Sequence, residues 1–136
     1  LASIKRVDDN LIITTSQRSS FEDQLNALAF ETYTLLTECG ATAGIHGAYP
    51  AWEPKFDTPL LKTAQDAYQQ VLGRAPKVKI IHAGLECGLF SKAMPSLSII
   101  SFGPTLLGVH SPDERLNIAS TNVMSHYLMH LLEKLS

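Results

Sequence analysis

After residue 57 the sequence alternates between helical and strand-like patterns, and this alternation limits the possible folds more than any other feature. The predicted elements are a helix from Thr58-Pro59 to Gly73, a strand over 77–81, a short helix over 85–94, a strand over 97–102 and a final helix over 117–135. The helices show apolar residues at i, i+3 and i+4, whereas the strands are short apolar runs. The order α-β-α-β-α predicts a parallel sheet with helices packed on it.

The first 57 residues carry a different pattern. The run "NLIITTS" over 10–16 predicts a strand, and Ser19 and Glu22 have the spacing of a capping box, before a helix from Phe21 to Gly40. A weaker strand is predicted over 41–49, where two glycines interrupt the apolar residues. Because the proline cluster that follows cannot continue a sheet, we expect a boundary near residues 50–57.

The composition fits a single soluble globular domain. The chain has 136 residues, of which 45% are hydrophobic and 18% charged, and its net charge of -2 offers no basic surface to a phosphate backbone. We therefore expect no nucleic-acid partner. The longest apolar runs are far shorter than the ~20 residues of a membrane span, so no membrane association is expected. Two separated cysteines favour a reducing, cytoplasmic location over a disulfide scaffold.

Two loops follow the predicted strands of the second half, "HAGLECG" over 82–88 and "GPTLLGVHSPDE" over 103–114. Ligands of parallel sheets gather beyond the carboxyl ends of the strands. If the two strands are neighbours, His82, Glu86 and His110 lie on one rim. His110 is then a candidate metal ligand, since neutral imidazole binds zinc, or else an ordinary surface histidine. No second ligand stands at a recognised spacing.

The other candidates each have a structural alternative. Glu86 could hold a substrate amine beside His82, or it could simply favour the first turn of the short helix. Cys87 could be a nucleophile with His82, although a small buried apolar residue is the commoner role of a lone cysteine. Arg18 could clamp a carboxylate, or lie exposed in a turn. His126 and His130 have a chelating spacing, but the buried stripe of the last helix leaves them on a solvated flank.

Longer segments of the sequence resemble a known family. "IIHAGLECGLF", "SFGPTLLGVHSPDERLNI" and a closing amphipathic helix are similar to the C-terminal end of aminoacyl-histidine dipeptidases, also called Xaa-His dipeptidases or peptidase D, of the M20 metallopeptidase clan. The segments "TTSQRSSFEDQ" and "HGAYPAWEP" extend this resemblance over essentially the whole chain. Such enzymes are several times longer and hold two metal ions, usually zinc, in a catalytic domain interrupted by a smaller lid domain.

The resemblance implies an α/β fold in two parts. Residues 1–52 resemble the second half of an α+β lid or dimerisation domain, and residues 53–136 resemble the C-terminal α-β-α-β-α portion of the catalytic domain. This organisation would account for a chain that begins at Leu1 within a strand-like pattern. The clan's other metal ligands and its general base have no counterpart here, so no catalytic residue is expected within these 136 residues.

The resemblance also implies roles for individual residues. His110 corresponds to the last metal ligand, and His82 and Glu86 fall in a loop that contacts the dipeptide substrate. The arginine that binds the substrate carboxylate in the clan lies a few positions before Arg18, where this sequence has Thr14 and Thr15.

Two hypotheses follow. In the first, the chain is the C-terminal part of a zinc-dependent dipeptidase cleaving Xaa-His dipeptides, inactive alone because one loop histidine cannot hold two metal ions. In the second, it is a free-standing small α/β module that binds an anionic metabolite at helix N-termini. Incomplete sheets would expose pairing edges, so a homo-oligomer is expected.

Overall fold

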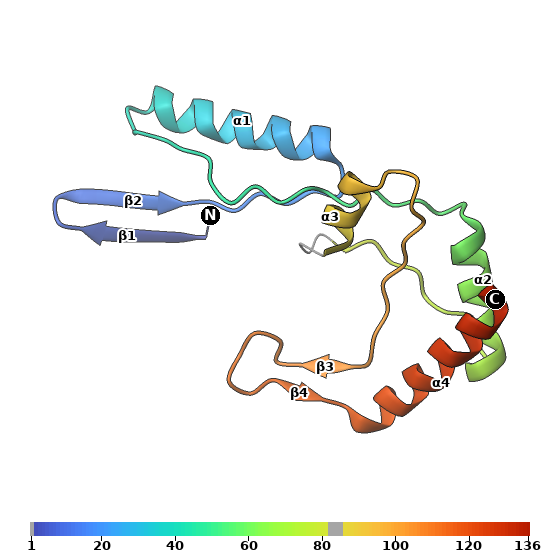
Figure 1. Ribbon diagram of the computed structural model, residues 1–136. Helices are drawn as coiled ribbons and strands as arrows, with labels where there is room; N and C mark the ends of the chain where they lie inside the picture. The colour runs from blue at the N-terminus through green and yellow to red at the C-terminus, as the bar shows by residue number, and fades with distance from the viewer. Residues whose placement is uncertain (1, 82–85) are drawn as a thin grey trace. The chain divides into compact units, whose positions relative to one another are not determined.

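The computed structural model describes residues 2–81 and 86–136, which form a mixed α/β structure in two compact units (Figure 1). The elements, in order, are β1 (Ser3–Val7), β2 (Asn10–Thr14), α1 (Glu22–Glu38), α2 (Pro59–Leu72), α3 (Glu86–Ala93), β3 (Leu106–Leu107), β4 (Arg115–Leu116) and α4 (Ile118–Leu135). The first unit comprises Leu1–Pro54 and Ile80–Pro95, and the second comprises Lys55–Lys79 and Ser96–Ser136. Among the described residues, no helix combines the length and apolar character needed to cross a membrane.

The first unit begins with an antiparallel hairpin of β1 and β2. Val7 pairs with Asn10, and Asp8 adopts a left-handed φ of 53° in the two-residue turn between them. The strand predicted from residue 10 is thus confirmed, and its partner β1 is an addition. A two-stranded sheet alone is marginally stable. Its apolar side chains remain exposed: Ile4, Val7, Leu11, Ile12 and Ile13.

Helix α1 ends as predicted but begins differently. Gly40 has a φ of 84°, and the Ala41 amide donates to the Leu36 carbonyl, which completes a Schellman motif. The predicted capping box is wrong, because the N-cap residue is Phe21 and no side chain caps it. The Glu22 carboxylate instead accepts a hydrogen bond of 2.8 Å from the Ala51 amide. Glu22, which was expected to take part in the capping box, therefore connects the start of α1 to the segment around Ala51.

Helix α3 is docked on that same segment through a glycine. Gly88 is buried, and a Cβ atom at this position would lie 2.5 Å from the Pro50 carbonyl oxygen. Only glycine permits so close an approach between a helix and a neighbouring backbone. The predicted short helix is confirmed, and the glycine of the "LECG" sequence has a packing function.

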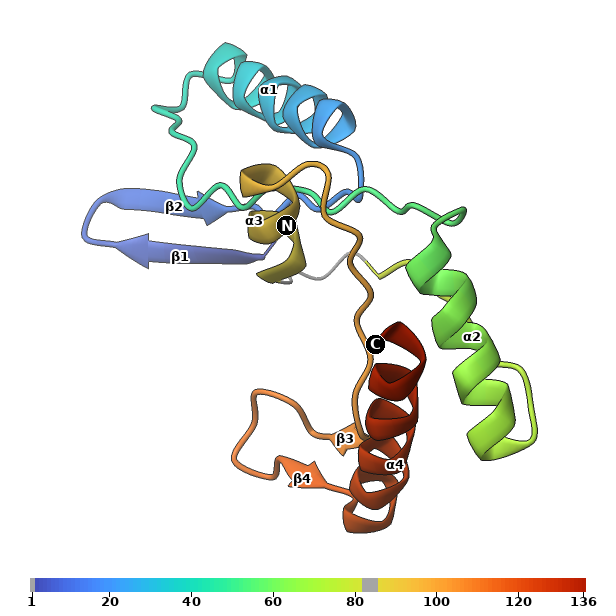
Figure 2. The same cartoon turned by 45° about the vertical axis from the view of Figure 1, so that its right-hand side comes forward.

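The second unit is built on the contact between α2 and α4, which lie side by side (Figure 2). Helix α2 has the predicted ends: Thr58 Oγ1 accepts from the Leu61 amide, and Gly73 has a φ of 69°. Asn117 caps α4 by accepting from the Ser120 amide at 2.9 Å. The buried core of the described residues consists of Ala64, Ala67, Tyr127 and Leu131, with Tyr68, Ile100 and Met124 packed against it.

Tyr127 makes the most varied contacts in this core. Its hydroxyl donates to the Ala64 carbonyl at 3.1 Å, and its ring meets those of Tyr68 and Phe102 edge-on, with centroids 5.4 and 4.7 Å away. Desolvation raises the pKa of Tyr127, with Tyr68 adding to the effect, so the phenol stays a hydrogen-bond donor at neutral pH.

The strands β3 and β4 form a short hairpin that is attached to the start of α4. The Asn117 amide donates to the Thr105 carbonyl at 3.0 Å, and the Thr105 amide donates to Ser120 Oγ at 2.9 Å. The hairpin leads directly into α4 in Figure 1. Its location within the second unit is therefore set by the first turn of that helix.

The strands predicted over 41–49, 77–81 and 97–102 are not formed, which corrects the sequence-based assignment. A strand needs a backbone ladder as well as an apolar run, and no described residue pairs with these segments. Ile80 and Ile81 are 51% and 54% exposed. Ile100, by contrast, packs on the core of the second unit without joining a sheet.

We predict that Tyr127 contributes more to stability than any exposed tyrosine. Replacement by Ala removes two ring contacts from the core and should lower the free energy of unfolding by about 3–5 kcal/mol. Replacement by Phe removes only the hydroxyl, and the Ala64 carbonyl keeps its intrahelical partner, so the loss should be about 0.5–1.5 kcal/mol. Urea denaturation would measure both, with Tyr33→Phe as the control. Equal stability of Tyr127→Ala and the parent protein would contradict the central place of this ring in the core.

Candidate functional site

His110 lies in the loop at the tip of the β3–β4 hairpin, and the loop is held by hydrogen bonds of its own. Ser111 donates to the Gly108 carbonyl through both its amide, at 3.0 Å, and its hydroxyl, at 2.6 Å. The same hydroxyl accepts from the Asp113 amide at 3.2 Å, and the Glu114 amide donates to the Ser111 carbonyl at 3.1 Å. The loop therefore has a defined backbone conformation although its residues are exposed.

The backbone of His110 adopts a left-handed conformation, with a φ of 64°. This conformation costs a residue with a side chain about 1–2 kcal/mol. The His110 amide donates to Glu114 Oε2 at 2.8 Å. A hydrogen bond contributes about 0.5–1.5 kcal/mol, so the bond to Glu114 offsets a strain of the same order. Gly108, two residues earlier, is also left-handed, but a glycine adopts this conformation without the steric cost.

The His110 imidazole is exposed and forms no hydrogen bond with a described residue. Its nitrogens are thus free to bind a ligand, which suits one donor of a metal site. A complete site needs about four donors. Within residues 2–81 and 86–136, no three side chains of His, Cys, Asp or Glu come together. The described residues therefore do not form a metal centre by themselves, and His110 is a candidate for a single ligand.

The second candidate group lies at the start of α3. His82 falls outside the described residues. Glu86 is exposed in the first turn, where its negative charge favours the helix and its carboxylate remains accessible. Glu86 belongs to the first unit and His110 to the second, and the parallel strand pairing that would bring their loops to one edge is absent from the described residues.

Cys87 is half-buried, and its surroundings raise the pKa of its thiol. Desolvation is the largest cause, a backbone hydrogen bond opposes it, and the negative charge of Glu86 adds to it. The thiolate, which is the nucleophilic form, is therefore disfavoured at neutral pH. The same carboxylate also raises the pKa of the Tyr49 phenol, after a larger effect of desolvation. Cys87 thus fits the role of a small packed side chain.

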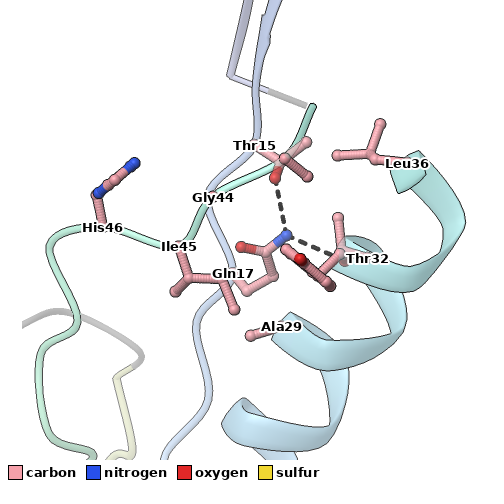
Figure 3. Close-up of a pocket in the computed structure, with 10 residues that line it drawn as sticks. Thr15, Gln17, Ala29, Thr32, Leu36, Gly44, Ile45 and His46 are labelled. Carbon is pink, nitrogen blue, oxygen red and sulfur yellow. Dashed lines mark hydrogen bonds between the residues drawn. The ribbon is translucent and has the colours of Figure 1, made fainter. Parts of the chain in front are cut away.

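Arg18 is exposed and has no hydrogen bond or ion pair with another described residue. Its neighbour Gln17 points instead into a pocket of the first unit (Figure 3). Gln17 Nε2 donates to Thr15 Oγ1 at 2.9 Å and to Thr32 Oγ1 at 3.1 Å. The pocket measures about 90 Å³. Gln17, Thr15 and Thr32 bind one another in this way, so they connect the end of β2 to α1.

His126 and His130 do not form a chelating pair. His126 is exposed, whereas His130 is half-buried, and its Nε2 lies 2.8 Å from Gln70 Oε1 on α2. Glu133 lies 3.7 Å from the other ring nitrogen. His130 therefore has partners that account for its position.

The sequence patterns did not identify Glu114, which contacts the backbone of a candidate ligand. The feature of the sequence that could have identified it is the spacing: Glu114 follows His110 by four residues, with Pro112 between them. Such a spacing lets a loop carboxylate reach back to an amide.

Known dipeptidases are similar to this chain in sequence and in structure. The chain is 36% identical over 132 residues to the cytosol non-specific dipeptidase of Escherichia coli (strain K12), an alignment that covers 97% of this chain and 27% of that protein. It is also similar to the crystal structure of the aminoacylhistidine dipeptidase from Vibrio alginolyticus, with a TM-score of 0.70, 34% identity, and coverage of 85% of this chain and 24% of that one.

The chain therefore spans about a quarter of the length of these relatives. The model of the family described as Peptidase family M20/M25/M40 matches residues 8–134, which is nearly the whole chain. The resemblance seen in the sequence is confirmed, and so is the expected α/β fold class. The chain belongs to peptidase family M20/M25/M40.

Proposed function

We propose that this chain is the C-terminal part of a zinc-dependent dipeptidase that hydrolyses Xaa-His dipeptides. The observation that carries the proposal is the likeness to a solved structure named aminoacylhistidine dipeptidase, with a TM-score of 0.70 at 34% identity. The E. coli relative is named a non-specific dipeptidase. Both names indicate a dipeptide substrate. A preference for histidine at the C-terminal position of the dipeptide is the more specific part of the proposal.

In this proposal, residues 1–52 belong to a lid domain and residues 53–136 to the catalytic domain. A division of the structure between Pro54 and Lys55 supports a boundary in this region. Residues 80–95 group with the first unit, so the structural units and the proposed domains differ over this segment. The site would then draw on residues outside this chain, which agrees with coverage of only 24–27% of the relatives.

His110 is the residue of this chain that we assign to the metal. Peptidases of this family are generally metal-dependent. Zinc in such a site supplies Lewis-acid chemistry toward the peptide carbonyl. The free, exposed imidazole on a constrained loop suits a ligand of this kind, and the remaining donors would come from elsewhere in the protein. Glu86, His82 and Arg18 are assigned to substrate binding, and Glu86 has the accessible carboxylate for a dipeptide amine.

The protein is further proposed to be cytoplasmic and homo-oligomeric. The word cytosol in the name of the E. coli relative supports the location. Exposed apolar side chains on both strands of the β1–β2 hairpin support association, because an uncovered two-stranded sheet presents a pairing edge.

The substrate assignment predicts how the full-length protein should behave. With Zn²⁺ it should hydrolyse Xaa-His dipeptides, lose activity in a chelator and regain it when Zn²⁺ is restored. The matched substrates are the same dipeptides with Ala in place of the C-terminal His, assayed by release of the free amino acid. Equal kcat/KM values for the two sets of dipeptides would contradict the proposed preference for a C-terminal histidine. Full activity in the chelator would overturn the metallopeptidase assignment.

The ligand assignment predicts a selective effect of one histidine. In the full-length protein, His110→Ala should reduce bound zinc and lower kcat/KM by at least about 100-fold, since even partners of ligands contribute roughly 10–100-fold. His126→Ala and His130→Ala should keep both values, although His130→Ala loses its contact with Gln70. Metal content would be measured by mass spectrometry. Unchanged zinc and turnover in His110→Ala would refute the assignment.

The isolated 136-residue chain should be inactive. It supplies one proposed ligand, so mixing it with Zn²⁺ and an Xaa-His dipeptide should give no hydrolysis above Zn²⁺ alone. The exposed hairpin should make it associate, which sedimentation at increasing concentration would detect. Robust turnover would contradict its status as a part of the enzyme, and a strictly monomeric chain would contradict the association.

A further inference from the structure

We propose that Glu114 is a positioning residue that fixes the His110 imidazole by binding the backbone of the same residue. The proposal rests on the assignment of His110 as a metal ligand. Glu114 Oε2 accepts from the His110 amide at 2.8 Å, and no described atom other than this oxygen bonds that amide. The carboxylate therefore acts on the conformation of residue 110 and not on its ring.

The effect follows from the unusual backbone of His110. Its φ of 64° directs the Cα–Cβ bond differently from the common conformations, in which φ is negative. Without a partner for its amide, this residue would relax toward negative φ and the imidazole would point elsewhere. A metal ligand must hold its nitrogen within a fraction of an ångström of the correct position. Preserving the backbone of His110 thus preserves the donor.

Among the described residues of the loop, Glu114 is the one that bonds the His110 amide. Ser111 connects Gly108, Asp113 and Glu114, but none of its hydrogen bonds reaches the His110 amide. The β3–β4 pairing holds the base of the loop and ends at Leu107 and Arg115. Asp113 is the neighbouring exposed carboxylate, and it joins the hydrogen bonds of the loop through its amide, which donates to Ser111 Oγ.

Two substitutions of Glu114 separate its hydrogen bond from its charge. Glu114→Gln keeps an oxygen acceptor at the same reach and removes the charge. Glu114→Asp keeps the charge but is one methylene shorter, so its carboxylate falls short of the amide. We expect Glu114→Gln to resemble the parent protein, and Glu114→Asp to resemble Glu114→Ala. Asp113→Asn is the control for the loss of a nearby charge.

The test measures binding of Zn²⁺ to the full-length protein by competition with a chelating dye. Glu114→Ala and Glu114→Asp should weaken one zinc equivalent by about 10- to 100-fold, as loss of a residue that orients a ligand does. Glu114→Gln and Asp113→Asn should change it little. The reverse order, with Asp retaining affinity and Gln losing it, would show a charge effect and overturn the proposal, as would unchanged affinity in Glu114→Ala.

A second readout does not involve the metal. Amide hydrogen exchange at residue 110, followed by NMR in the zinc-free protein, should lose its protection in Glu114→Ala and keep it in Glu114→Gln. Equal protection in both would overturn the positioning role. His110→Ala distinguishes the two proposals: if it leaves zinc binding intact, the ligand assignment fails, whereas if it weakens zinc binding and Glu114→Ala does not, only the role of Glu114 fails.

Discussion

Tyr127 lies where α2, α4 and the extended segment through Phe102 meet, and the position of the β3–β4 hairpin depends on these contacts. The hydroxyl bond to the Ala64 carbonyl and the two edge-on ring contacts hold α4 against its neighbours. The start of α4 then binds Thr105 through Asn117 and Ser120. Because Thr105 leads into the hairpin, a buried phenol near the chain's end determines where His110 can lie within the second unit.

The helices could be predicted from the sequence because their signals are local. Thr58-Pro59, Gly73 and Gly40 each define a helix end through hydrogen bonds or φ values within a few residues. The capping box did not form, and the Glu22 carboxylate accepts instead from the Ala51 amide, which lies far away in the sequence. Local spacing identifies the residues that can cap a helix, but tertiary contacts decide which of them do.

The predicted strands failed for a physical reason that concerns pairing. An apolar run such as 97–102 indicates that its side chains avoid water, and Ile100 and Phe102 do pack on the α2–α4 core. It does not indicate that a neighbouring backbone is available, and without one no ladder forms. The same limit applies to the site. His110 could be selected as a candidate from its loop, whereas among the described residues no group of three metal-binding side chains comes together to complete a site.

The "HSPDE" sequence joins a strained residue to the group that offsets its strain. Left-handed φ at His110 is unfavourable for a residue with a Cβ atom, whereas Pro112 has only a narrow range of φ and lowers the conformational entropy that the loop loses on folding. Glu114 then needs only the reach of one side chain to bind the His110 amide. A glycine at 110 would remove the strain but also the imidazole. In the proposed role of His110 as a metal donor, Glu114 supplies a nearby acceptor for the left-handed residue, and an exposed carboxylate does so without burying a charge.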